Sequence, residues 1–419
     1  MPKPIHRTTL RYRALVILLS PIAFGYTVYR AVKDGGRRYF LQRFGIDYPR
    51  ITLPSLLIHC ASVGEFHAAK PLIFKLRDLY PDHHLVISTN TPTAAVLVSK
   101  LEDKKISHVY MSLDYSFAVS QLLAHVRPVC VLVLETEIWP TLFFQAAKND
   151  ITIAIINGRL SDKTLRANRF LKNEQQFSLQ NLDLILARSE EDRLKFLRLG
   201  AEHQTTHVGG NLKYASTRID KPLQQTATKY PFVLAISTHE DEELQLAQHL
   251  PLLREKKHLL VIAPRYPERS QALCRQLQQQ NWTVSLHSQA NGTTSQTDVY
   301  IVDTFGELDG FLSEAALVFV GGSLISRGGH NLLEPAGFGK CTVIGPHTEN
   351  FALETKELQE ADGVIQVDDN QDLGLELARL LNNTDVRDQY GKNAQQFVRQ
   401  KASVLDSYIE HLRPILQPT

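Results

Sequence analysis

Short apolar runs recur along most of this chain, and each ends in a polar or glycine-containing turn. The runs have the length of buried strands, about four to eight residues, and stretches with helical periodicity lie between them. Strands that alternate with helices predict parallel sheets covered by helices on both faces. The expected strands lie at residues 53–60, 86–89, 129–134, 151–156, 182–186, 232–236, 259–263, 299–302, 315–320 and 342–344.

The pattern restarts near residue 207, where a glycine-containing segment at residues 208–214 resembles a hinge. We therefore expect an α/β protein with two doubly wound domains, at residues 51–206 and 207–395. Polar residues gather just after the strands, at the edge where open parallel sheets bind ligands. The carboxyl edge of each sheet is expected to face a cleft between the two domains. Residues 396–419 predict a C-terminal helix that could pack back on the first domain.

The first fifty residues differ from the rest in charge and hydropathy. They carry ten Lys and Arg residues against Asp34 and Asp47, although the whole chain has a net charge of +2. Residues 14–28 are mostly apolar but lack the small-residue cleavage pattern of a signal peptide. We expect residues 1–50 to anchor the protein at an anionic membrane surface, through a short span or an interfacial helix. The alternative is a buried core helix.

The cysteines and histidines do not indicate a metal site. The four cysteines are far apart, and three of them lie in apolar runs, so they resemble buried thiols of a reducing compartment. No histidine or acidic pair has metal-ligand spacing, and an Asp-x-Asp motif for a divalent ion is absent from the sequence. We therefore expect neither a metal nor a bound cofactor.

Residues 319–340 combine an apolar strand end, two glycine pairs and an expected helix start at residues 330–334. Gly321 and Gly322, then Gly328 and Gly329, let the backbone turn sharply and approach a ligand closely. In many α/β proteins such a turn holds a nucleotide phosphate, because unpaired helix-start N–H groups face the anion. Glu334 could then accept from both ribose hydroxyls. The alternative is a tight strand-to-helix connection with Glu334 stabilised by the helix dipole.

Glu65 is the sharpest candidate for a general base. It follows the first expected strand in a glycine-containing loop, where a carboxylate can reach a ligand. The same spacing, Ser62-x-x-Glu65, is also a capping box, in which the glutamate only accepts from helix-start donors. Spacing alone leaves both interpretations open.

Glu135 and Glu137 follow another expected strand, on either side of a threonine. If their carboxylates converge, mutual repulsion should raise one of the two pKa values. They could orient an acceptor or complete a charge network. The alternative is a structural ion pair with Arg159 or Lys163.

Two cations are candidates for binding an anionic group. Arg265 follows Pro264 at a strand end and is well placed to pair with a phosphate or carboxylate. Lys213 lies in the segment between the domains and could neutralise a leaving phosphate. The alternative for each is a solvated loop cation.

Seven motifs follow one another in order over roughly residues 55–350. They are Ala61-Ser62-Val63-Gly64-Glu65, Glu135-Thr136-Glu137-Ile138-Trp139-Pro140, Asn157-Gly158-Arg159-Leu160-Ser161, Gly210-Asn211-Leu212-Lys213, Pro264-Arg265, Asp303-Thr304-Phe305-Gly306-Glu307-Leu308, and Gly321-Gly322-Ser323 with His330-Asn331-Leu332-Leu333-Glu334-Pro335. Together they resemble the motifs of the 3-deoxy-D-manno-octulosonic acid (Kdo) transferases, membrane-associated glycosyltransferases of lipopolysaccharide assembly. Seven ordered motifs are far more specific than any one of them.

The resemblance implies a GT-B fold, with an acceptor-binding first domain and a second domain that binds the donor CMP-Kdo. It implies inverting transfer of Kdo to a lipid A precursor, lipid IVA, at the cytoplasmic face of the bacterial inner membrane, without nucleic acid. Glu65 would be the base, and Glu135 and Lys213 would stabilise the transition state. The residues that match the CMP-binding motifs are Pro264, Arg265, Phe305, Gly306, Glu307, Asn331, Leu332, Leu333 and Glu334.

The departures from the family pattern are mild, since Phe305 and Asn90 each stand where methionine is common in the family. Two rival functions remain open. One is a UDP-dependent GT-B enzyme, and the other is a membrane-anchored nucleotide-binding scaffold without catalysis. An NAD-dependent oxidoreductase is disfavoured, because no G-x-G-x-x-G follows the first expected strand.

Overall fold

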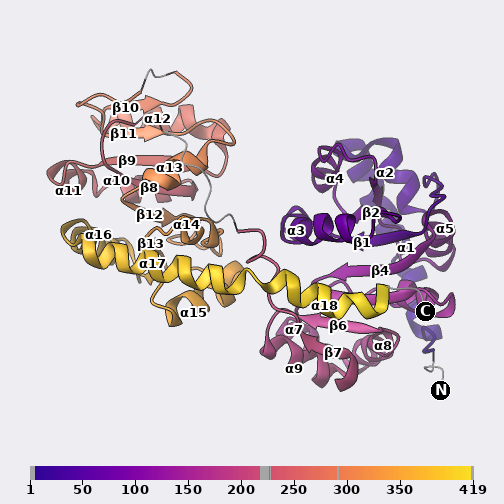
Figure 1. Ribbon diagram of the computed structural model, residues 1–419. Coiled ribbons are helices and arrows are strands. Elements are labelled where there is room, and N and C mark those ends of the chain that lie inside the picture. Colours follow the sequence, from indigo (N-terminus) through magenta and orange to yellow (C-terminus); the bar gives the residue numbers. More distant parts are fainter. Residues whose placement is uncertain (1–4, 218–225, 227, 290–291, 417–419) are drawn as a thin grey trace. The chain divides into compact units, whose positions relative to one another are not determined.

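The computed structural model describes residues 5–217, 226, 228–289 and 292–416. It divides into two compact units (Figure 1). Met1–Ser216 and Ser403–Thr419 form the first unit, and Thr217–Ala402 form the second. Each unit contains one seven-stranded sheet with helices around it. The predicted pair of doubly wound, parallel-sheet α/β domains is confirmed.

The sheet of the first unit has the order β3-β2-β1-β4-β5-β6-β7, and every neighbouring pair is parallel. Its inner strands are continuous apolar runs because helices cover both faces. The strands are β1 (Ser55–His59), β2 (His84–Thr89), β3 (Ile106–Tyr110), β4 (Pro128–Leu134), β5 (Thr152–Gly158), β6 (Leu184–Ala187) and β7 (Thr206–Val208).

Two hydrophobic cores lie on the two faces of this sheet. Leu57 and Val131 point into one core, whereas their neighbours Ile58 and Leu132 point into the other, as the period of two in a strand requires. The helices of this unit are α1 (Leu10–Arg30), η1 (Ala31–Gly35), α2 (Gly36–Arg43), α3 (Val63–Leu79), α4 (Pro92–Ser99), α5 (Ser116–Val126), α6 (Pro140–Lys148), α7 (Asp162–Leu165), α8 (Arg169–Gln180), α9 (Glu190–Leu199), η2 (His203–Thr205) and α18 (Val404–Leu416).

The sheet of the second unit has the order β10-β11-β9-β8-β12-β13-β14 and is also parallel throughout. Its strands are β8 (Phe232–Thr238), β9 (Leu259–Pro264), β10 (Val284–Leu286), β11 (Val299–Ile301), β12 (Leu317–Val320), β13 (Thr342–Ile344) and β14 (Ile365–Gln366). The helices are α10 (Glu242–Ala247), α11 (Leu250–Glu255), η3 (Pro267–Arg269), α12 (Ser270–Gln279), α13 (Leu308–Glu314), α14 (Leu333–Gly337), η4 (Glu349–Phe351), α15 (Ala352–Glu360), α16 (Asn370–Asn382) and α17 (Thr384–Lys401).

The strand order reverses between β1 and β4 in the first sheet and between β8 and β12 in the second. At such a point the loops after adjacent strands leave in opposite directions, which opens a crevice at the carboxyl edge. Glu65 follows β1 and Glu135 follows β4, while the residue pair His239 and Gly321 follows β8 and β12. Each unit therefore has its candidate residues at its own switch point.

The N-terminal helices form a hairpin on the first unit. The stretch Leu10–Arg43 is long and apolar enough, by length and composition, to cross a membrane. It turns at Gly36, whose φ of +67° is readily adopted only by glycine. Phe24 of α1 then packs on Phe40 and Phe44, with ring centroids 5.9 and 5.8 Å apart. Most apolar side chains of α1 remain exposed, which argues against a buried core helix.

The C-terminal helix α18 belongs to the first unit, whereas α17 belongs to the second. Tyr408 of α18 is fully buried in the core that also contains Ile58. Its hydroxyl accepts from the N–H of Asn157 and donates to the carbonyl of Gly210, both at 2.9 Å. One side chain thereby joins the end of β5 to the segment that precedes Lys213.

Candidate active site

Glu65 lies in the first turn of α3 and forms the capping box. Ser62 is the N-cap, and its hydroxyl accepts from the N–H of Glu65 at 3.3 Å. The Glu65 carboxylate accepts from the N–H of Ala61 at 2.8 Å and from the Ser62 hydroxyl at 3.1 Å. The carboxylate therefore makes hydrogen bonds typical of a helix cap. These bonds alone do not indicate a catalytic role.

Those other properties are electrostatic. Burial raises the pKa of Glu65 to about 8, and the negative charges of Glu135 and Glu137 act in the same direction. The hydrogen bonds from Ala61 and Ser62 lower this pKa but do not offset the burial. A glutamate used only as a helix cap is usually ionised and solvated. A partly buried carboxyl group whose pKa is raised to near neutral pH is instead typical of general acid–base catalysis.

Glu135 and Glu137 lie in the turn after β4, where Glu135 adopts a left-handed φ of +56°. One carboxylate oxygen of Glu135 lies 3.2 Å from Nε of Arg159, so one of the two ion pairs considered from the sequence is formed. The pKa of Glu137 is raised, mainly by burial and to a smaller extent by Glu135. Three carboxyl groups thus influence one another at this switch point.

His59 lies beside these carboxyl groups, although the sequence did not single it out. Its Nδ1 is 3.0 Å from the Ser88 hydroxyl, and its Nε2 is 3.9 Å from the Glu137 carboxylate. Burial, aided by the Arg43 charge, lowers the pKa of His59 to about 3. The imidazole is therefore neutral near pH 7, and its contact with Glu137 is not an ion pair. His59 could have been identified from the sequence by its position near the end of an expected strand.

Arg43 brings the N-terminal hairpin to the same edge of the sheet. Its guanidinium is buried and donates to Oδ1 of Asn90 and to the carbonyl of Met111, both at 2.9 Å. Its charge also lowers the pKa of Glu137. Asn90 therefore contacts the hairpin.

Lys213 is positioned by a network that starts at β5. The amide oxygen of Asn157 accepts from the N–H of Leu212 at 3.0 Å. The next N–H, that of Lys213, donates to Oδ1 of Asn211 at 3.1 Å. Asn157 itself has a left-handed φ of +52°, which places its side chain towards this segment. The Asn157 and Gly210 motifs of the sequence are therefore in direct contact.

The glycine turn of the second unit is filled by an internal carboxylate. Glu242, the first residue of α10, is fully buried. It accepts from the N–H groups of Gly322, Ser323 and Leu324 at 2.8, 3.1 and 3.1 Å, and from that of His239 at 3.3 Å. The N–H groups of Gly322, Ser323 and Leu324 therefore have a partner within the protein and are not open to a phosphate. Glu242 was not identified from the sequence.

Two histidines contact each other at this switch point. Nε2 of His239 lies 2.8 Å from Nε2 of His330, and the rings stack with centroids 5.0 Å apart. Burial, with the charge of Arg265 and the presence of His239, lowers the pKa of His330 to about 4. The pKa of His239 is lowered by burial and by Arg327, Arg269 and Arg265. The positive charges of three arginines therefore affect the histidine pair, and the same charges would stabilise an anionic group bound there.

The other candidate donor-binding residues lie on loops of the second unit. Pro264 ends β9, and the N–H of the exposed Arg265 donates to the carbonyl of Thr238 at 3.0 Å. Phe305 is 83% exposed, next to Gly306, whose φ is +91°. The carboxylate of Glu307 is 2.8 Å from Nε2 of His287. An aromatic ring held out in solvent is available for stacking on a base.

The segment from Asn331 to Glu334 is only partly helical. The helix α14 begins at Leu333 and has five residues, so His330 and Asn331 precede it, in contrast to the expected helix start at residue 330. The amide oxygen of Asn331 accepts from the N–H of Leu333 at 3.1 Å. Leu332 and Leu333 are buried, whereas Glu334 is exposed to solvent. This segment therefore presents polar groups without a long helix dipole.

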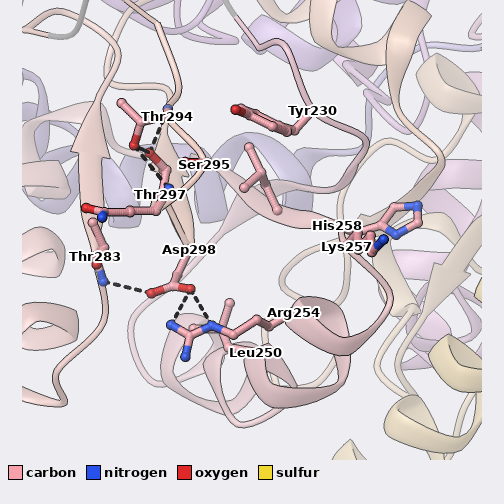
Figure 2. Close-up of a pocket in the computed structure, with 12 residues that line it drawn as sticks. Tyr230, Leu250, Arg254, Lys257, His258, Thr283, Thr294, Ser295, Thr297 and Asp298 are labelled. Atoms are coloured by element: carbon pink, nitrogen blue, oxygen red, sulfur yellow. Dashed lines mark hydrogen bonds and ion pairs between the residues drawn. The ribbon is translucent and has the colours of Figure 1, made fainter.

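A hollow of about 560 Å³ in the second unit lies away from these residues. It is found where β8, β9 and β11 begin, at the opposite edge of the sheet from Arg265 and Gly321. Asp298 accepts from Arg254 and from the N–H of Thr283 there, as Figure 2 shows. These bonds join α11 to the sheet, so Asp298 at the hollow has a structural role. Within the described ranges, no cluster of three metal-ligating side chains occurs.

Solved structures confirm the fold. The chain matches a UDP-GlcNAc 2-epimerase from Neisseria meningitidis with a TM-score of 0.58 and 15% identity, over 86% of this chain and all of that chain. It matches a glycosyltransferase from Rickettsia africae with a TM-score of 0.58 and 12% identity, over 88% of this chain and all of that chain. At these identities, the similarity establishes a GT-B-like architecture and not a substrate.

Protein families identify the chain more closely. A family model described as 3-deoxy-D-manno-octulosonic-acid transferase (kdotransferase) matches residues 38–216. The chain is 30% identical to the 3-deoxy-D-manno-octulosonic acid transferase of Haemophilus influenzae, over 97% of this chain and 98% of that protein. It is 32% identical to the transferase of the same name from Rickettsia felis, over 86% and 79% of the two chains. This chain therefore belongs to the Kdo transferases, a family of glycosyltransferases of lipopolysaccharide biosynthesis.

Proposed function

We propose that this enzyme transfers Kdo from CMP-Kdo to the lipid A precursor lipid IVA, with inversion at the anomeric carbon and with Glu65 as general base. The single observation that carries the proposal is the position of Glu65 at the switch point between β1 and β4, where it is partly buried beside Glu135 and Glu137 and its pKa is raised to about 8. Family membership supplies the reaction class. The roles of individual residues follow from their chemistry.

In the proposed step, the acceptor hydroxyl attacks the anomeric carbon of Kdo from the face opposite the phosphate. The new C–O bond forms as the bond to the phosphate oxygen breaks, and CMP leaves with that electron pair. The hydroxyl proton passes to Glu65 in its ionised form, which with a pKa of about 8 is the smaller fraction near pH 7 and grows as pH rises. Such a transfer typically contributes about 10²–10⁴-fold to the rate. Ala61 and Ser62 hold the carboxylate in one orientation through their hydrogen bonds. We assign transition-state stabilisation to Glu135 and Lys213.

The second unit has groups suited to a cytidine monophosphate. Arg265 and Arg327 are exposed cations beside the histidine pair and can neutralise the phosphate of departing CMP without a metal ion. Because the ring of Phe305 is exposed to solvent, it can stack on the cytosine base. We assign the remaining polar contacts to Pro264, Gly306, Glu307 and residues 331–334. The reaction as proposed needs no cofactor besides the donor.

The N-terminal hairpin suits a membrane surface better than a span. The hydroxyl of Tyr12, near the start of α1, donates to Asp114 at 2.8 Å. Phe24, near its end, packs on Phe44, which in turn stacks on Tyr115. Both ends of α1 therefore contact the first unit, as in a helix that lies in the interface with its apolar side towards lipid. We propose attachment to the cytoplasmic face of the inner membrane, where the lipid acceptor is present.

The proposal is tested by incubating the full chain, in phospholipid vesicles, with labelled CMP-Kdo and lipid IVA. Appearance of Kdo-linked lipid, with release of one CMP for each Kdo transferred, is the expected result. In parallel assays, CMP or UDP is added to the protein and the melting temperature is measured. A ligand that binds the folded protein raises this temperature by mass action. Stabilisation by UDP but not CMP would favour a UDP-dependent enzyme. CMP binding by a protein that transfers no Kdo would favour a non-catalytic scaffold.

A further inference from the structure

A cavity of about 280 Å³ lies in the first unit between the start of α1 and the segments that begin α5 and α6. We call it the α1 cavity. It is not part of the carboxylate cluster, and neither the motifs nor the proposed chemistry uses it. Apolar and aromatic side chains form most of its wall, namely Val16, Ile17, Tyr115, Phe117 and Phe144.

The polar groups of the α1 cavity are already engaged within the protein. The Asp114 carboxylate accepts from the Tyr12 hydroxyl and from the N–H groups of Thr141 and Leu142, at 2.8, 2.9 and 3.1 Å. The hydroxyl and carbonyl of Ser116 accept from Nε2 of Gln145, at 2.9 and 2.7 Å. A ligand that brings no hydrogen-bonding groups therefore loses little on entering, which favours a hydrocarbon over a sugar or a peptide.

The α1 cavity opens onto an exposed apolar surface. Ile17, which lines it, is 70% exposed, and Phe117 on its other side is 59% exposed. Leu18 and Ile22 continue this exposed apolar surface along α1. An exposed apolar surface of this kind on a helix is typical of an element that lies among lipid chains.

Cations surround this end of α1. Arg7 and Arg11 are exposed, and Nε of Arg13 donates to the Thr8 hydroxyl at 3.1 Å. Arginine side chains pair well with phosphates. An apolar cavity beside several arginines complements an anionic lipid, with its chain inside and its phosphate at the rim.

The cavity also lies on the sheet edge that holds the candidate base. Thr141 belongs to the first turn of α6, which begins directly after the Glu135–Trp139 turn. Asp114 follows β3, whose carboxyl end lies on the same edge as those of β1 and β4. A lipid that has one chain in the cavity would be attached to the protein on the catalytic edge of the first unit.

We propose that the α1 cavity binds an acyl chain of the lipid acceptor. The inference rests on the proposed function, since only a Kdo transferase with a lipid acceptor needs such a site. It assigns to Val16, Ile17 and Phe117 a role in acceptor binding, apart from any role of α1 in membrane attachment.

A photocrosslinking experiment tests occupancy without requiring transfer. The full chain in phospholipid vesicles is irradiated with a lipid IVA analogue that carries a diazirine at the end of one acyl chain, and labelled peptides are identified by mass spectrometry. We expect labelling of the segments that contain Phe117 and Phe144, with competition by unlabelled acceptor. Val16→Trp should fill the cavity and reduce labelling at least about tenfold, equivalent to 1.4 kcal/mol of binding. Leu18→Trp, a neighbouring exposed position outside the cavity, should not.

A diazirine-labelled phospholipid separates the two sources of an acyl chain. Equal labelling of the same segments by this phospholipid, without competition by the acceptor, would overturn the proposal. Equal effects of Val16→Trp and Leu18→Trp would also overturn it, because the label would then report only the apolar surface of α1. Labelling that follows the expected pattern would support the cavity even if no Kdo transfer were observed, so failure of the proposed function remains distinguishable.

A kinetic comparison uses residues of equal type and exposure. Ile17 lines the cavity and Ile22 does not, although both lie on α1 and are 70% and 71% exposed. Ile17→Asp should raise the KM for the acylated acceptor at least about fivefold, because a carboxylate at the entrance opposes entry of the chain. KM for a deacylated acceptor should not change, and Ile22→Asp should leave the ratio of the two KM values as in the wild type. An unchanged ratio in Ile17→Asp would contradict the proposal.

Discussion

The carboxylate of Glu242 accepts a hydrogen bond of 2.8 Å from the N–H of Gly322, at the centre of the glycine turn that follows β12. Three further N–H groups donate to the same carboxylate. The turn is thus stabilised from inside the protein. A Cβ at Gly321 would lie 2.6 Å from Cα of Thr238, 2.7 Å from the carbonyl oxygen of Ser237 and 2.8 Å from the Glu242 carboxylate, so this position requires glycine.

Glu242→Ala should destabilise the second unit strongly. Four N–H groups would lose their partner, two of them buried and two partly buried. Each unsatisfied buried group costs about 1–3 kcal/mol. We expect a loss of at least about 3 kcal/mol in the free energy of unfolding, measured with urea. Glu240→Ala is the matched control, because Glu240 is exposed and such surface changes stay within about 0.5 kcal/mol. A comparable small effect of both substitutions would contradict this role of Glu242.

The raised pKa of Glu65 predicts a dependence of stability on pH. The folded protein holds the proton up to a pKa of about 8, whereas the unfolded chain releases it near the ordinary glutamate pKa of 4.5. Between these values the folded state binds more protons, so the free energy of unfolding falls as pH rises. Each unit of pKa shift corresponds to about 1.4 kcal/mol. Glu65→Gln should therefore gain stability relative to the wild type from about pH 5 to pH 8. A constant difference over that range would refute the shift.

Tyr408→Phe should loosen the attachment of α18 to the first unit. The hydroxyl makes two hydrogen bonds, to Asn157 and to Gly210, and its loss leaves a buried N–H without a partner. We expect a cost of about 1–3 kcal/mol. Hydrogen exchange should show faster exchange in Val404–Leu416 and in the segment around Gly210. Tyr230→Phe, in the second unit, is the control and should leave both segments unchanged.

Phe305→Ala should weaken CMP binding without affecting stability. Phe305 is 83% exposed, so its removal creates no cavity. Stacking of a base on an aromatic side chain contributes about 1–3 kcal/mol, so Kd for CMP should rise at least about fivefold. Isothermal titration gives the affinity. Leu375→Ala, which removes another exposed apolar side chain of the same unit, should leave Kd as it was. Unchanged CMP affinity in Phe305→Ala would remove this residue from the donor site.

The fold could be predicted from the sequence wherever strands are buried on both faces. The strands that were not expected are β3, β7, β10 and β14, and these are the four edge strands of the two sheets. An edge strand has one neighbour and is shorter or partly exposed, so it lacks a continuous apolar run. β3 illustrates this, since Ser107 and His108 interrupt the apolar residues of its sequence Ile106-Ser107-His108-Val109-Tyr110.

The candidate site was less predictable because it depends on contacts between distant segments. Ser62-x-x-Glu65 specifies a helix cap locally, but the pKa of Glu65 depends on burial and on Glu135, which lies seventy residues further along the chain. Glu242 lies about eighty residues before the glycine turn that it fills. The hairpin of α1 and α2 depends on Gly36, and residues 14–28 alone could not show that the helix turns back.

The most direct test of the central claim compares Glu65→Gln and Glu65→Ala in Kdo transfer from CMP-Kdo to lipid IVA. Glutamine can keep the capping box but cannot accept a proton, whereas alanine removes both functions. Asp372→Asn, at the start of α16, is the control for a helix-start carboxylate far along the chain from the site. If Glu65 is the base, both Glu65 variants lose at least about a hundredfold in kcat while CMP affinity is preserved. Near wild-type transfer by Glu65→Gln would show that Glu65 is only a helix cap.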